Sequence, residues 1–286
     1  MDLGRVGVWS SQLRYGDPGS VATAAAELEA LGYGAIWVPG GAGGDVLGDC
    51  GRLLDATERV VLAPGILNIW MHDPGEVADG HHRLTAAHPG RFLLGLGVSH
   101  ALLIDRTGTY ARPLAKMREY LDALDGAHTP VPTGERILAA LGPKMLELAR
   151  DRSAGTHPYL VTPEHTATAR EAVGPGKLVA PEQKVVLDTD AGRARAIARE
   201  ALGIYLRLPN YTNNLLRTGF SEDDLAGGGS DRLIDGIVAW GDEAAIAARV
   251  RAHHDAGADH VCIQVLLADR AAMPLDEWRR LGLALC

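Results

Sequence analysis

The segment from Leu141 to Met145 is the one best suited to holding an anion. An apolar run ends at Leu141, and Gly142 turns the chain. Pro143 suits the first position of a helix, and Lys144 adds a cation beside it. The first N–H groups of a helix have no partner inside the helix, so they bind phosphate or carboxylate, which the helix dipole favours. The alternative interpretation is an ordinary strand-to-helix turn with a surface lysine.

A second candidate site lies in the segment 90–100, which reads GRFLLGLGVSH. Its GLG resembles the start of a dinucleotide-binding fingerprint, but His100 stands where a third glycine is required and no helix follows directly. The Rossmann interpretation therefore fails. What remains is a strand end at which Gly97 leaves the backbone open, followed by Val98, Ser99 and His100. Alternatively, Gly97 only fits a tightly packed strand and His100 is a loop residue.

Other common catalytic patterns are missing from the sequence. It offers no Ser-His-Asp or Cys-His arrangement and no paired carboxylates at one strand end. The histidines at 81, 82, 88, 253 and 254 are interpreted as helix-surface residues, so no metal site is predicted. Cys50, Cys262 and Cys286 lie too far apart for a disulfide framework, and we expect reduced thiols in a cytoplasmic protein.

Aromatic side chains stand near the same strand ends. Trp9 and Trp70 are placed to line a pocket for a flat ring, and Tyr110 is near another strand end, whereas Trp37 is expected in the core. Backbone groups, aromatic rings and an anion site, without a nucleophile or a metal, favour a bound organic cofactor.

These residues need a framework that brings several strand ends together. Eight short apolar runs alternate with amphipathic stretches, and most of the runs end in Gly, Pro, Ser or Asn. This alternation predicts an α/β fold of the (β/α)8 TIM-barrel type, in which the chemistry lies where the strands end. The runs are Arg5–Ser10, Gly34–Pro39, Val60–Asn68, Phe92–Ser99, Arg136–Leu141, Gly155–Val161, Lys184–Asp188 and His260–Leu267.

Two of the runs carry unusual residues at the predicted barrel mouth. The second run leads directly into the glycine-rich segment 40–44, which either lets a ligand approach the backbone or forms a mobile loop. The third run contains Pro64 and Gly65. A proline removes one donor from the strand ladder, so we expect a bulge at this point.

The length of 286 residues, 47% of them hydrophobic, fits a single barrel domain over residues 1–286. One long departure from the alternation, Pro209–Ala239, is predicted as a partly helical insertion before the last strand. An excursion of this length in a compact barrel is usually a lid, a binding loop or a dimer contact.

Composition excludes several classes of partner. The net charge of -8 argues against nucleic-acid binding as the main function. The first residues lack a long apolar segment, so no signal peptide is expected, and no apolar run approaches the roughly 20 residues of a spanning helix. Neither a nucleic acid nor a membrane is therefore an expected partner.

Five long segments together resemble the bacterial-luciferase-like superfamily. They read VVLAPGILNIWMHDP, HPGRFLLGLGVSH, YARPLAKMREYLDALD, ILAALGPKMLELARDRSAGTHPYLVTPEHTATAR and DAGADHVCIQVL. Within the superfamily they look most like actinobacterial oxidoreductases that use the deazaflavin coenzyme F420. The resemblance covers nearly the whole chain, with its segments in order.

This resemblance implies a cofactor ring at the carboxyl-terminal mouth of the barrel, with one face against a bulge in the third strand. In the family that bulge carries a non-proline cis peptide, which falls at about Gly65–Ile66 here. The implied contacts to the cofactor tail and phosphate are Val98, Ser99, Leu141, Gly142, Lys144 and Met145. Further expected cofactor contacts are Trp9, Gly40, Gly41, Gly65, Ile66, Asn68 and Gly97, and expected substrate contacts are Trp70, His72 and Tyr110.

The chain departs from many relatives just after the second strand. Many of them carry an acidic residue or a histidine there, which in some serves as a catalytic acid or base, whereas this chain has Pro39, Gly40 and Gly41. Water, His100 or the substrate must then supply any proton. His100 is the predicted catalytic residue because it follows the fourth strand and imidazole titrates near neutral pH.

The resemblance favours an oxidoreductase that transfers a hydride between F420 and a small organic substrate. An FMN-dependent monooxygenase is the first alternative, since both cofactors have a flat ring and a phosphorylated tail. A cofactor-binding protein without turnover is the second alternative, which the glycine-only segment 40–44 favours. We expect a homodimer, as in many relatives, and possible dependence on a separate reductase that supplies the reduced cofactor.

Overall fold

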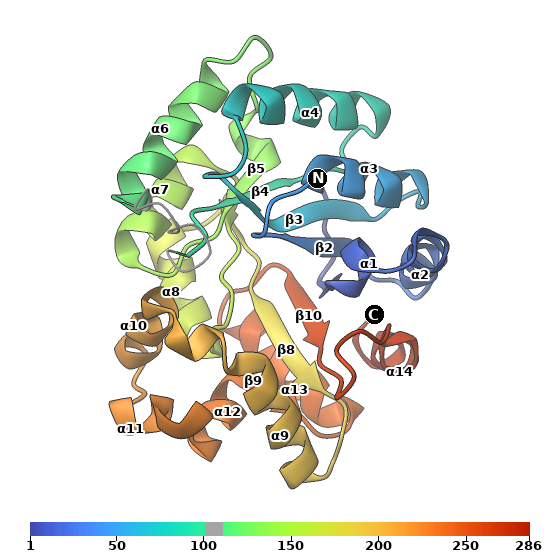
Figure 1. Cartoon of the computed structure of the whole chain (residues 1–286), viewed down its shortest axis with the longest axis vertical. Coiled ribbons are helices and arrows are strands. Elements are labelled where there is room, and N and C mark those ends of the chain that lie inside the picture. The colour runs from blue at the N-terminus through green and yellow to red at the C-terminus, as the bar shows by residue number, and fades with distance from the viewer. Residues whose placement is uncertain (101–110) are drawn as a thin grey trace.

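The structure is a computed structural model, which describes residues 1–100 and 111–286. Its described strands form one parallel sheet in the order β7-β6-β5-β4-β3-β2-β1-β10-β8-β9, which curls into a barrel (Figure 1). This confirms the predicted α/β barrel. The strands are β1 (Val6–Trp9), β2 (Ala35–Gly40), β3 (Val61–Asn68), β4 (Leu94–Gly97), β5 (Arg136–Leu138), β6 (Gly155–Thr156), β7 (Leu178–Val179), β8 (Glu182–Val186), β9 (Val238–Trp240) and β10 (Val261–Val265).

The segment 178–186 closes the barrel. Its first part, β7, pairs with β6, and its second part, β8, pairs with β10. The N–H of Glu182 donates to the carbonyl of Pro158 at 2.9 Å, and the N–H of Cys262 donates to the carbonyl of Pro181 at 3.1 Å. The two sides of the sheet are therefore joined by backbone hydrogen bonds, which leaves no free edge at this position.

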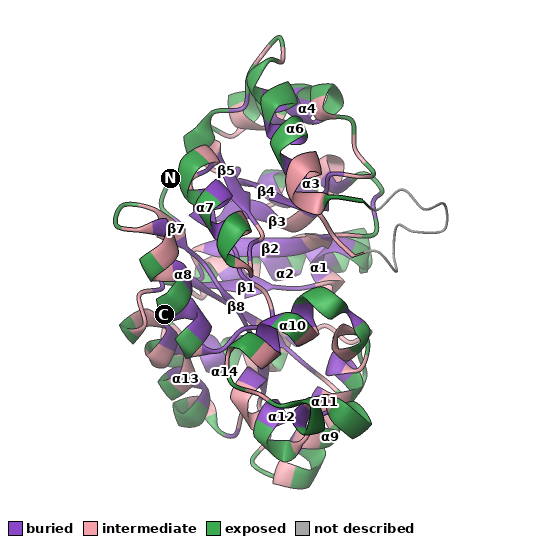
Figure 2. Cartoon of the chain, turned by 90° about the vertical axis from the view of Figure 1, so that its left-hand side faces the viewer, coloured by how far each residue is buried: buried purple, intermediate pink, exposed green. Residues whose placement is uncertain are grey.

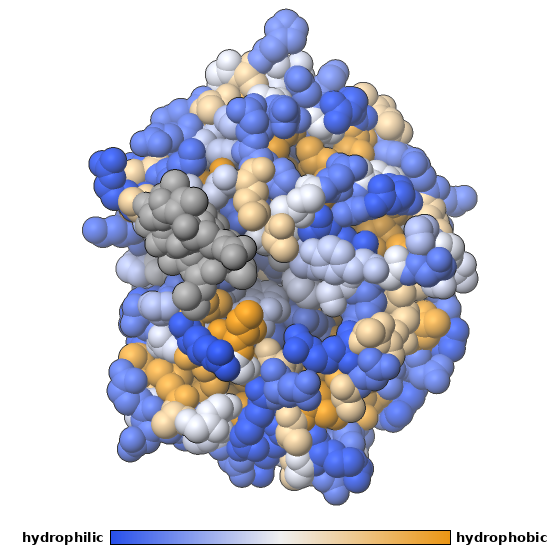
Figure 3. Space-filling view, viewed as in Figure 1, coloured by the Kyte–Doolittle hydropathy of each residue, from blue (hydrophilic) through white to orange (hydrophobic). Residues whose placement is uncertain are grey.

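Helices cover the outside of the barrel, and Figure 2 shows the buried strands inside a layer of helices with exposed outer faces. On the face shown in Figure 3, polar side chains surround small groups of apolar ones. The helices are α1 (Gln12–Tyr15), α2 (Pro18–Ala30), α3 (Val46–Asp55), α4 (Pro74–Ala87), α6 (Pro113–Asp125), α7 (Pro143–Arg152), α8 (Pro163–Val173), α9 (Ala191–Leu202), α10 (Pro209–Arg217), α11 (Glu222–Leu225), α12 (Asp231–Ile237), α13 (Glu243–Asp255) and α14 (Leu275–Leu285), with 3-10 turns η1 (Thr133–Glu135), η2 (Tyr205–Arg207) and η3 (Ala226–Gly228). Within the described ranges, no helix is long and apolar enough to span a membrane.

Side-chain caps explain where several of these helices begin. Thr162 accepts from the N–H of His165 ahead of α8, and Asp242 accepts from the N–H of Ala245 ahead of α13. Pro163 occupies the first turn of α8, where a missing N–H costs nothing. These caps fix where the chain turns from strand to helix, and so they fix the rim of the barrel.

Two short strands were not predicted from the apolar runs. β7 has two residues ahead of Pro181, too few for an alternating pattern to be visible. β9 lies at the end of the segment predicted as the insertion and pairs with β8 through Lys184 and Val238. In the sixth run only Gly155–Thr156 forms a strand, which is shorter than expected. Pro158 has no N–H to donate to a neighbouring strand, so the pairing does not continue.

The predicted insertion folds into α10, α11, η3 and α12, which lie together at the lower left of Figure 1. Leu208, Tyr211 and Leu215 of this segment share an apolar cluster with Leu202 of α9. Arg195 of α9 also binds two carboxylates of α12, at 2.7 and 2.5 Å. The insertion is thus packed against the barrel.

The bulge in β3 is where the predicted irregularity lies. The register of β2 on β3 shifts between Val38 and Gly40, and the Gly65–Ile66 peptide is cis, which confirms the expectation. A Cβ on Gly40 would lie 2.6 Å from the carbonyl oxygen of Ile66, and one on Gly97 would lie 2.4 Å from Cγ1 of Ile66. Both neighbouring strands therefore need glycine at these positions, because a side chain at either one would collide with Ile66.

Gly95→Ala should destabilise the barrel. Its Cβ would lie 1.9 Å from the carbonyl oxygen of Pro64, a backbone atom that cannot move without shifting β3. Overpacking of this kind costs about 1–3 kcal/mol of unfolding free energy. Urea unfolding of Gly95→Ala should show this loss, while Gly134→Ala, whose Cβ meets nothing within 4 Å, serves as the control. Equal stabilities for the two variants would contradict the packing argument.

Candidate functional site

A cavity of about 890 Å³ lies at the carboxyl ends of β1 to β6. Residues of the η2–α10 segment complete its side. Its size falls in the range of small-molecule sites in proteins. It is lined by Trp9, Tyr15, Pro39, Gly41, Ala42, Gly65, Ile66, Gly97, Val98, Ser99, His100, Pro113, Leu114, Ala139, Ala140, Leu141, Gly142, Pro143, Lys144, Met145, His157, Tyr159, Ile204, Tyr205, Arg207, Leu208, Asn210, Tyr211, Asn213 and Arg217.

The structure brings most of the sequence-predicted site residues into this one cavity. Those that line it are Trp9, Gly41, Gly65, Ile66, Gly97, Val98, Ser99, His100, Leu141, Gly142, Lys144 and Met145. Gly40, Asn68, Trp70 and His72 are not among the lining residues, and Tyr110 lies outside the described residues.

Asn68 and Trp70 do not line the cavity, but they hold in place the backbone segments that do. The amide nitrogen of Asn68 donates to the carbonyl of Gly41 at 2.9 Å, and its oxygen accepts from the N–H of Trp70 at 3.0 Å. The indole N–H of Trp70 in turn donates to the carbonyl of Val98 at 2.9 Å. These two side chains thus tie the segments after β2 and β4 to the end of β3.

Gly40 and His72 also lie behind the lining. Gly40 accommodates the carbonyl of Ile66, as described above, so its role in the structure is close packing. The Nε2 atom of His72 is buried without a hydrogen-bond partner. Burial, followed by the nearby charge of Arg14, lowers the pKa of His72.

The glycine segment after β2 is held in place by Arg14. This buried guanidinium donates to the carbonyls of Pro39 and Gly43, each at 2.6 Å, and pairs with Asp49 at 2.6 Å. These contacts favour the interpretation in which a ligand approaches the backbone of this segment. Gly41 presents backbone to the cavity, because the nearest atom to a Cβ there would be Oγ of Ser99 at 3.9 Å.

The β3 bulge forms the floor of the cavity. The indole N–H of Trp9 donates to the carbonyl of Gly65 at 3.1 Å. A Cβ on Gly65 would lie 2.6 Å from Nε1 of Trp9 and 2.9 Å from Nε2 of His157, so only glycine fits. With Ile66, Gly97 and Val98 beside it, the floor is apolar and suits one face of a flat ring.

His157 is a cavity residue that sequence reasoning missed. Its Nδ1 donates to the carbonyl of Ala180 at 2.7 Å, so the neutral ring carries its lone pair on Nε2. Nε2 is buried, has no partner and lies beside Gly65. The ring stacks on Trp37 with centroids 4.2 Å apart, and burial lowers its pKa to about 4. His157 is the third residue of the sixth run, Gly155–Val161, and no pattern in the sequence distinguishes it from an ordinary strand residue.

At the start of α7, where the sequence predicts an anion site, the structure places Arg217 as well as Lys144. Gly142 is the N-cap, no side chain caps this turn, and a Cβ on Gly142 would meet only Nη2 of Arg217, at 3.8 Å. Lys144 of the first turn of α7 and Arg217 lie at this end of the cavity, and Arg207 lines the same cavity from the end of η2. None of the three forms an ion pair with any described residue. Because two of them lie in the η2–α10 segment, sequence spacing gave no sign that they join Lys144.

An aromatic wall, defined here as Tyr159, Tyr205 and Tyr211, forms another side of the cavity. The ring centroids of Tyr159 and Tyr205 are 5.4 Å apart, and Tyr205 meets Tyr211 edge-on at 5.4 Å. Trp9 lies 5.5 Å from Tyr159 and links this wall to the floor. Sequence reasoning missed the wall because two of its members follow α9, far along the chain from the strand ends.

His100 joins the same side of the cavity. Its Nδ1 is 3.1 Å from Oδ1 of Asn210, and its ring is 5.1 Å from that of Tyr211. Burial lowers the pKa of His100 below its ordinary value of 6.5, and the bond to Asn210 opposes part of this shift. The imidazole is therefore neutral at pH 7, the form in which it accepts a proton.

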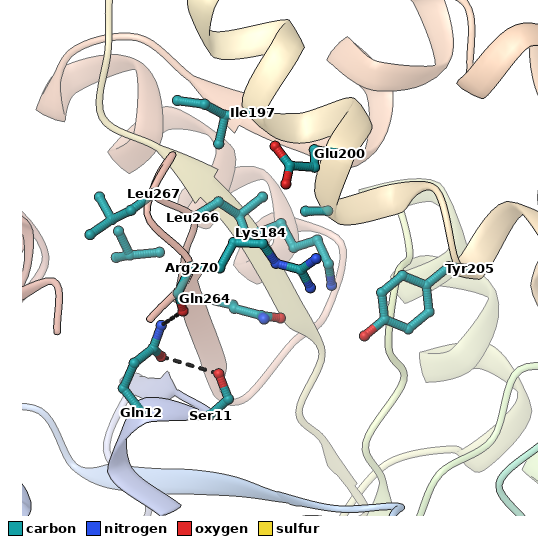
Figure 4. A pocket seen from close by; sticks show the side chains of 12 residues that line it. Ser11, Gln12, Lys184, Ile197, Glu200, Tyr205, Gln264, Leu266, Leu267 and Arg270 are labelled. Atoms are coloured by element: carbon teal, nitrogen blue, oxygen red, sulfur yellow. Dashed lines mark hydrogen bonds between the residues drawn. The ribbon is translucent and has the colours of Figure 1, made fainter. Parts of the chain in front are cut away.

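A buried ion pair supports the aromatic wall from behind. Nζ of Lys184 lies 3.1 Å from both carboxylate oxygens of Glu182 and 3.6 Å from the ring centroid of Tyr159. Beyond it is a smaller pocket of about 60 Å³ between α1, α9 and the end of β10. Figure 4 shows Lys184 and Gln264 inside this pocket, with Tyr205 at its edge. Tyr205 also lines the large cavity, so it stands between the two.

The described residues fit a flat cofactor with an anionic tail. The floor is apolar, Gly41 and Gly142 leave room where side chains would intrude, and Nε2 of His157 is an unpaired acceptor beside the floor. The start of α7, with Lys144 and Arg217 beside it, suits a phosphate.

Comparison with known proteins agrees with this geometry. Residues 1–260 match the family model described as luciferase-like monooxygenase. A 5,10-methylenetetrahydromethanopterin reductase from Archaeoglobus fulgidus is 25% identical over 198 residues, which cover 58% of this chain and 59% of that protein. The chain thus matches less than two thirds of that relative's length.

Solved structures share the whole fold at low sequence identity. An F420-dependent secondary alcohol dehydrogenase in complex with an F420-acetone adduct superposes with a TM-score of 0.75 at 16% identity, covering 99% of both chains. The oxygenating constituent of 3,6-diketocamphane monooxygenase from Pseudomonas putida, in complex with FMN, gives a TM-score of 0.69 at 12% identity, covering 98% of this chain and 96% of the other.

The chain belongs to the luciferase-like monooxygenase family. This confirms the resemblance seen in the sequence. It places the protein among luciferase-like oxidoreductases, whose structural neighbours include both an F420-dependent enzyme and an FMN-bound enzyme.

Stability should fall in mild acid because several buried histidines are held neutral. The helix-surface interpretation is wrong for His81 and His253, which are 3% and 0% exposed. Burial lowers the pKa of His81, His157 and His260 to about 4, whereas the unfolded chain titrates near 6.5. Between these values the unfolded chain binds more protons, so the unfolding free energy decreases as the pH falls from 6.5 towards 4.

For His157 alone the loss at pH 5 is on the order of 2 kcal/mol. Urea unfolding at pH 7 and pH 5 measures the loss for the whole chain, and His157→Gln should show a smaller difference between the two pH values than the unmodified protein. Identical unfolding free energies at both pH values in the unmodified protein would refute this assignment.

Proposed function

We propose that this protein is an F420-dependent oxidoreductase that transfers a hydride between the deazaflavin ring and a small organic substrate. One observation carries the proposal: Lys144, Arg207 and Arg217, which form no ion pair with a described residue, line a mainly apolar cavity, and Lys144 and Arg217 lie at a helix start that no described side chain caps. The tail of F420 carries a phosphate and further carboxylates. Several cations match these several anionic groups, whereas a single phosphate needs fewer cations.

The chain's own residues would bind and orient the cofactor. When bound, F420 supplies a carbon that donates or accepts a hydride. The floor residues Gly65, Ile66 and Val98 would support one ring face and leave the other face for substrate. Lys144, Arg207 and Arg217 would hold the tail, so that ring and substrate meet at about 3–3.5 Å with water excluded.

His100 is the candidate for moving a proton. It lines the cavity, is neutral at pH 7, and is oriented by Asn210. In the direction that oxidises an alcohol, a neutral imidazole accepts the hydroxyl proton as the hydride leaves the carbon. In the reducing direction the protonated ring returns that proton to the oxygen.

A fluorescence titration with F420 and with FMN tests the choice of cofactor. We expect F420 to bind at least tenfold more tightly, because its tail meets more cations. Tighter FMN binding, together with oxygen consumption when reduced FMN is supplied, would overturn the F420 assignment in favour of an FMN-dependent monooxygenase, which the FMN-bound structural neighbour also supports. Bound reduced F420 that no acceptor oxidises, across a broad panel, would favour a binding protein without turnover.

Arg217→Gln and Lys144→Ala should each weaken F420 binding. A charge-assisted hydrogen bond to a phosphate or carboxylate contributes about 1–3 kcal/mol, so the dissociation constant should rise roughly 5- to 100-fold. Arg150→Gln is the matched control, since Arg150 lies in the last turn of the same helix, α7. The same titration measures all three variants, and an unchanged affinity for Arg217→Gln and Lys144→Ala would remove these cations from the binding site.

A further inference from the structure

We propose that the aromatic wall binds a planar, uncharged carbonyl compound whose oxygen accepts a hydrogen bond from the hydroxyl of Tyr211. This inference rests on the proposed function and deepens it, because it assigns the chemical class of the substrate. The proposed substrate site is the part of the cavity that the cofactor would not occupy.

The wall lies across the barrel from the floor. In the closed ring, β3 and β8 are separated by β2, β1 and β10 on one side and by β4, β5, β6 and β7 on the other. Tyr159 packs over Nζ of Lys184, which is a residue of β8, at 3.6 Å. A ring that rests on the β3 bulge therefore has its free face towards Tyr159 and its neighbours, and a substrate must fit between them.

The hydroxyls of the wall differ in their hydrogen bonds. Tyr159 donates to the side-chain oxygen of Gln264 at 2.9 Å. Its oxygen lies 3.0 Å from that of Tyr205, and because Tyr159 has already donated its proton, Tyr205 donates in that pair. Two of the three hydroxyl protons are thus used within the protein.

Tyr211 keeps its hydroxyl proton for a ligand. Among the hydrogen bonds of residues 1–100 and 111–286, none involves this hydroxyl, and it is not among the fully buried atoms without a partner. The ring itself is fixed, since it contacts Tyr205 edge-on at 5.4 Å and His100 at 5.1 Å. A fixed ring with a free hydroxyl that lines the cavity is a donor for an acceptor oxygen.

The neighbourhood of Tyr211 suits an uncharged, planar molecule. Lys184 is the cation nearest Tyr159, and it is paired with Glu182, so it offers no net charge to a ligand. Of the other lining cations, Lys144 and Arg217 lie at the start of α7. The ring faces of Tyr159, Tyr205 and Trp9 provide stacking and edge contacts that favour a flat apolar body. An aromatic or conjugated ketone or aldehyde has this shape and one acceptor oxygen.

Infrared spectroscopy with acetophenone labelled with 13C at its carbonyl tests the inference directly. We expect the carbonyl stretch of the bound probe to move to lower wavenumber, because the hydrogen bond weakens the C=O bond. Tyr211→Phe should abolish the shift and raise the dissociation constant of acetophenone roughly fivefold. Tyr205→Phe is the matched control: its hydroxyl already donates to Tyr159, so the band should keep its wild-type position.

The same samples are titrated with F420, so that the two proposals fail separately. No binding of acetophenone to the wild type, no band shift in it, or a shift that survives Tyr211→Phe would overturn the Tyr211 assignment, while F420 binding leaves the proposed cofactor standing. The predicted band shift without F420 binding would support the carbonyl site and overturn the cofactor assignment. Unchanged F420 affinity and circular dichroism of Tyr211→Phe show that the variant is folded.

Discussion

Close packing around the β3 bulge is the constraint on which the rest of the site depends. The peptide at Gly65–Ile66 lies against backbone or side-chain atoms of both neighbouring strands, so those strands must carry glycine at the contact points. Trp9 fixes the bulge by donating to the carbonyl of Gly65. The result is a barrel mouth with a flat apolar floor, where a regular strand with ordinary side chains would fill the space.

The remaining parts of the cavity are built on this floor by buried polar contacts. Arg14 and Asn68 hold the carbonyls of the glycine segment after β2, and Trp70 holds that of Val98. A carbonyl that accepts one of these hydrogen bonds points towards the donor and away from the cavity. Side chains that do not line the cavity thus hold its walls in place. The barrel mouth therefore has a defined shape although the chain has no acidic residue or histidine just after the second strand.

Sequence patterns predicted the framework and the backbone features of the site. The apolar runs predicted the barrel, the LGPK pattern predicted the helix start at Pro143, and the resemblance predicted the cis peptide at Gly65–Ile66. These features depend on residues that are close together in the chain, so local periodicity and turn chemistry are sufficient to find them. The luciferase-like family match confirms the resemblance itself.

Features that join distant segments were not predictable in the same way. Arg207, Arg217 and Tyr211 reach the cavity only because α10 packs back over the barrel. His157 enters the floor because its strand ends after two residues, which no alternation shows. Asn68 and Trp70 lie at a strand end, as expected. Their side chains, however, donate to neighbouring backbone carbonyls and do not line the cavity. The direction of a side chain at a strand end is set by tertiary contacts, and one sequence does not contain them.

The proposed binding mode places a planar, phosphorylated redox cofactor on the β3 bulge with its tail at the start of α7. A crystal structure of the protein soaked with F420 measures this directly. We expect the deazaflavin ring against Ile66 and Val98, with its phosphate within hydrogen-bonding distance of Lys144 or Arg217. A ring bound at the amino-terminal end of the barrel, or a mouth closed by side chains with no room for it, would refute this binding mode.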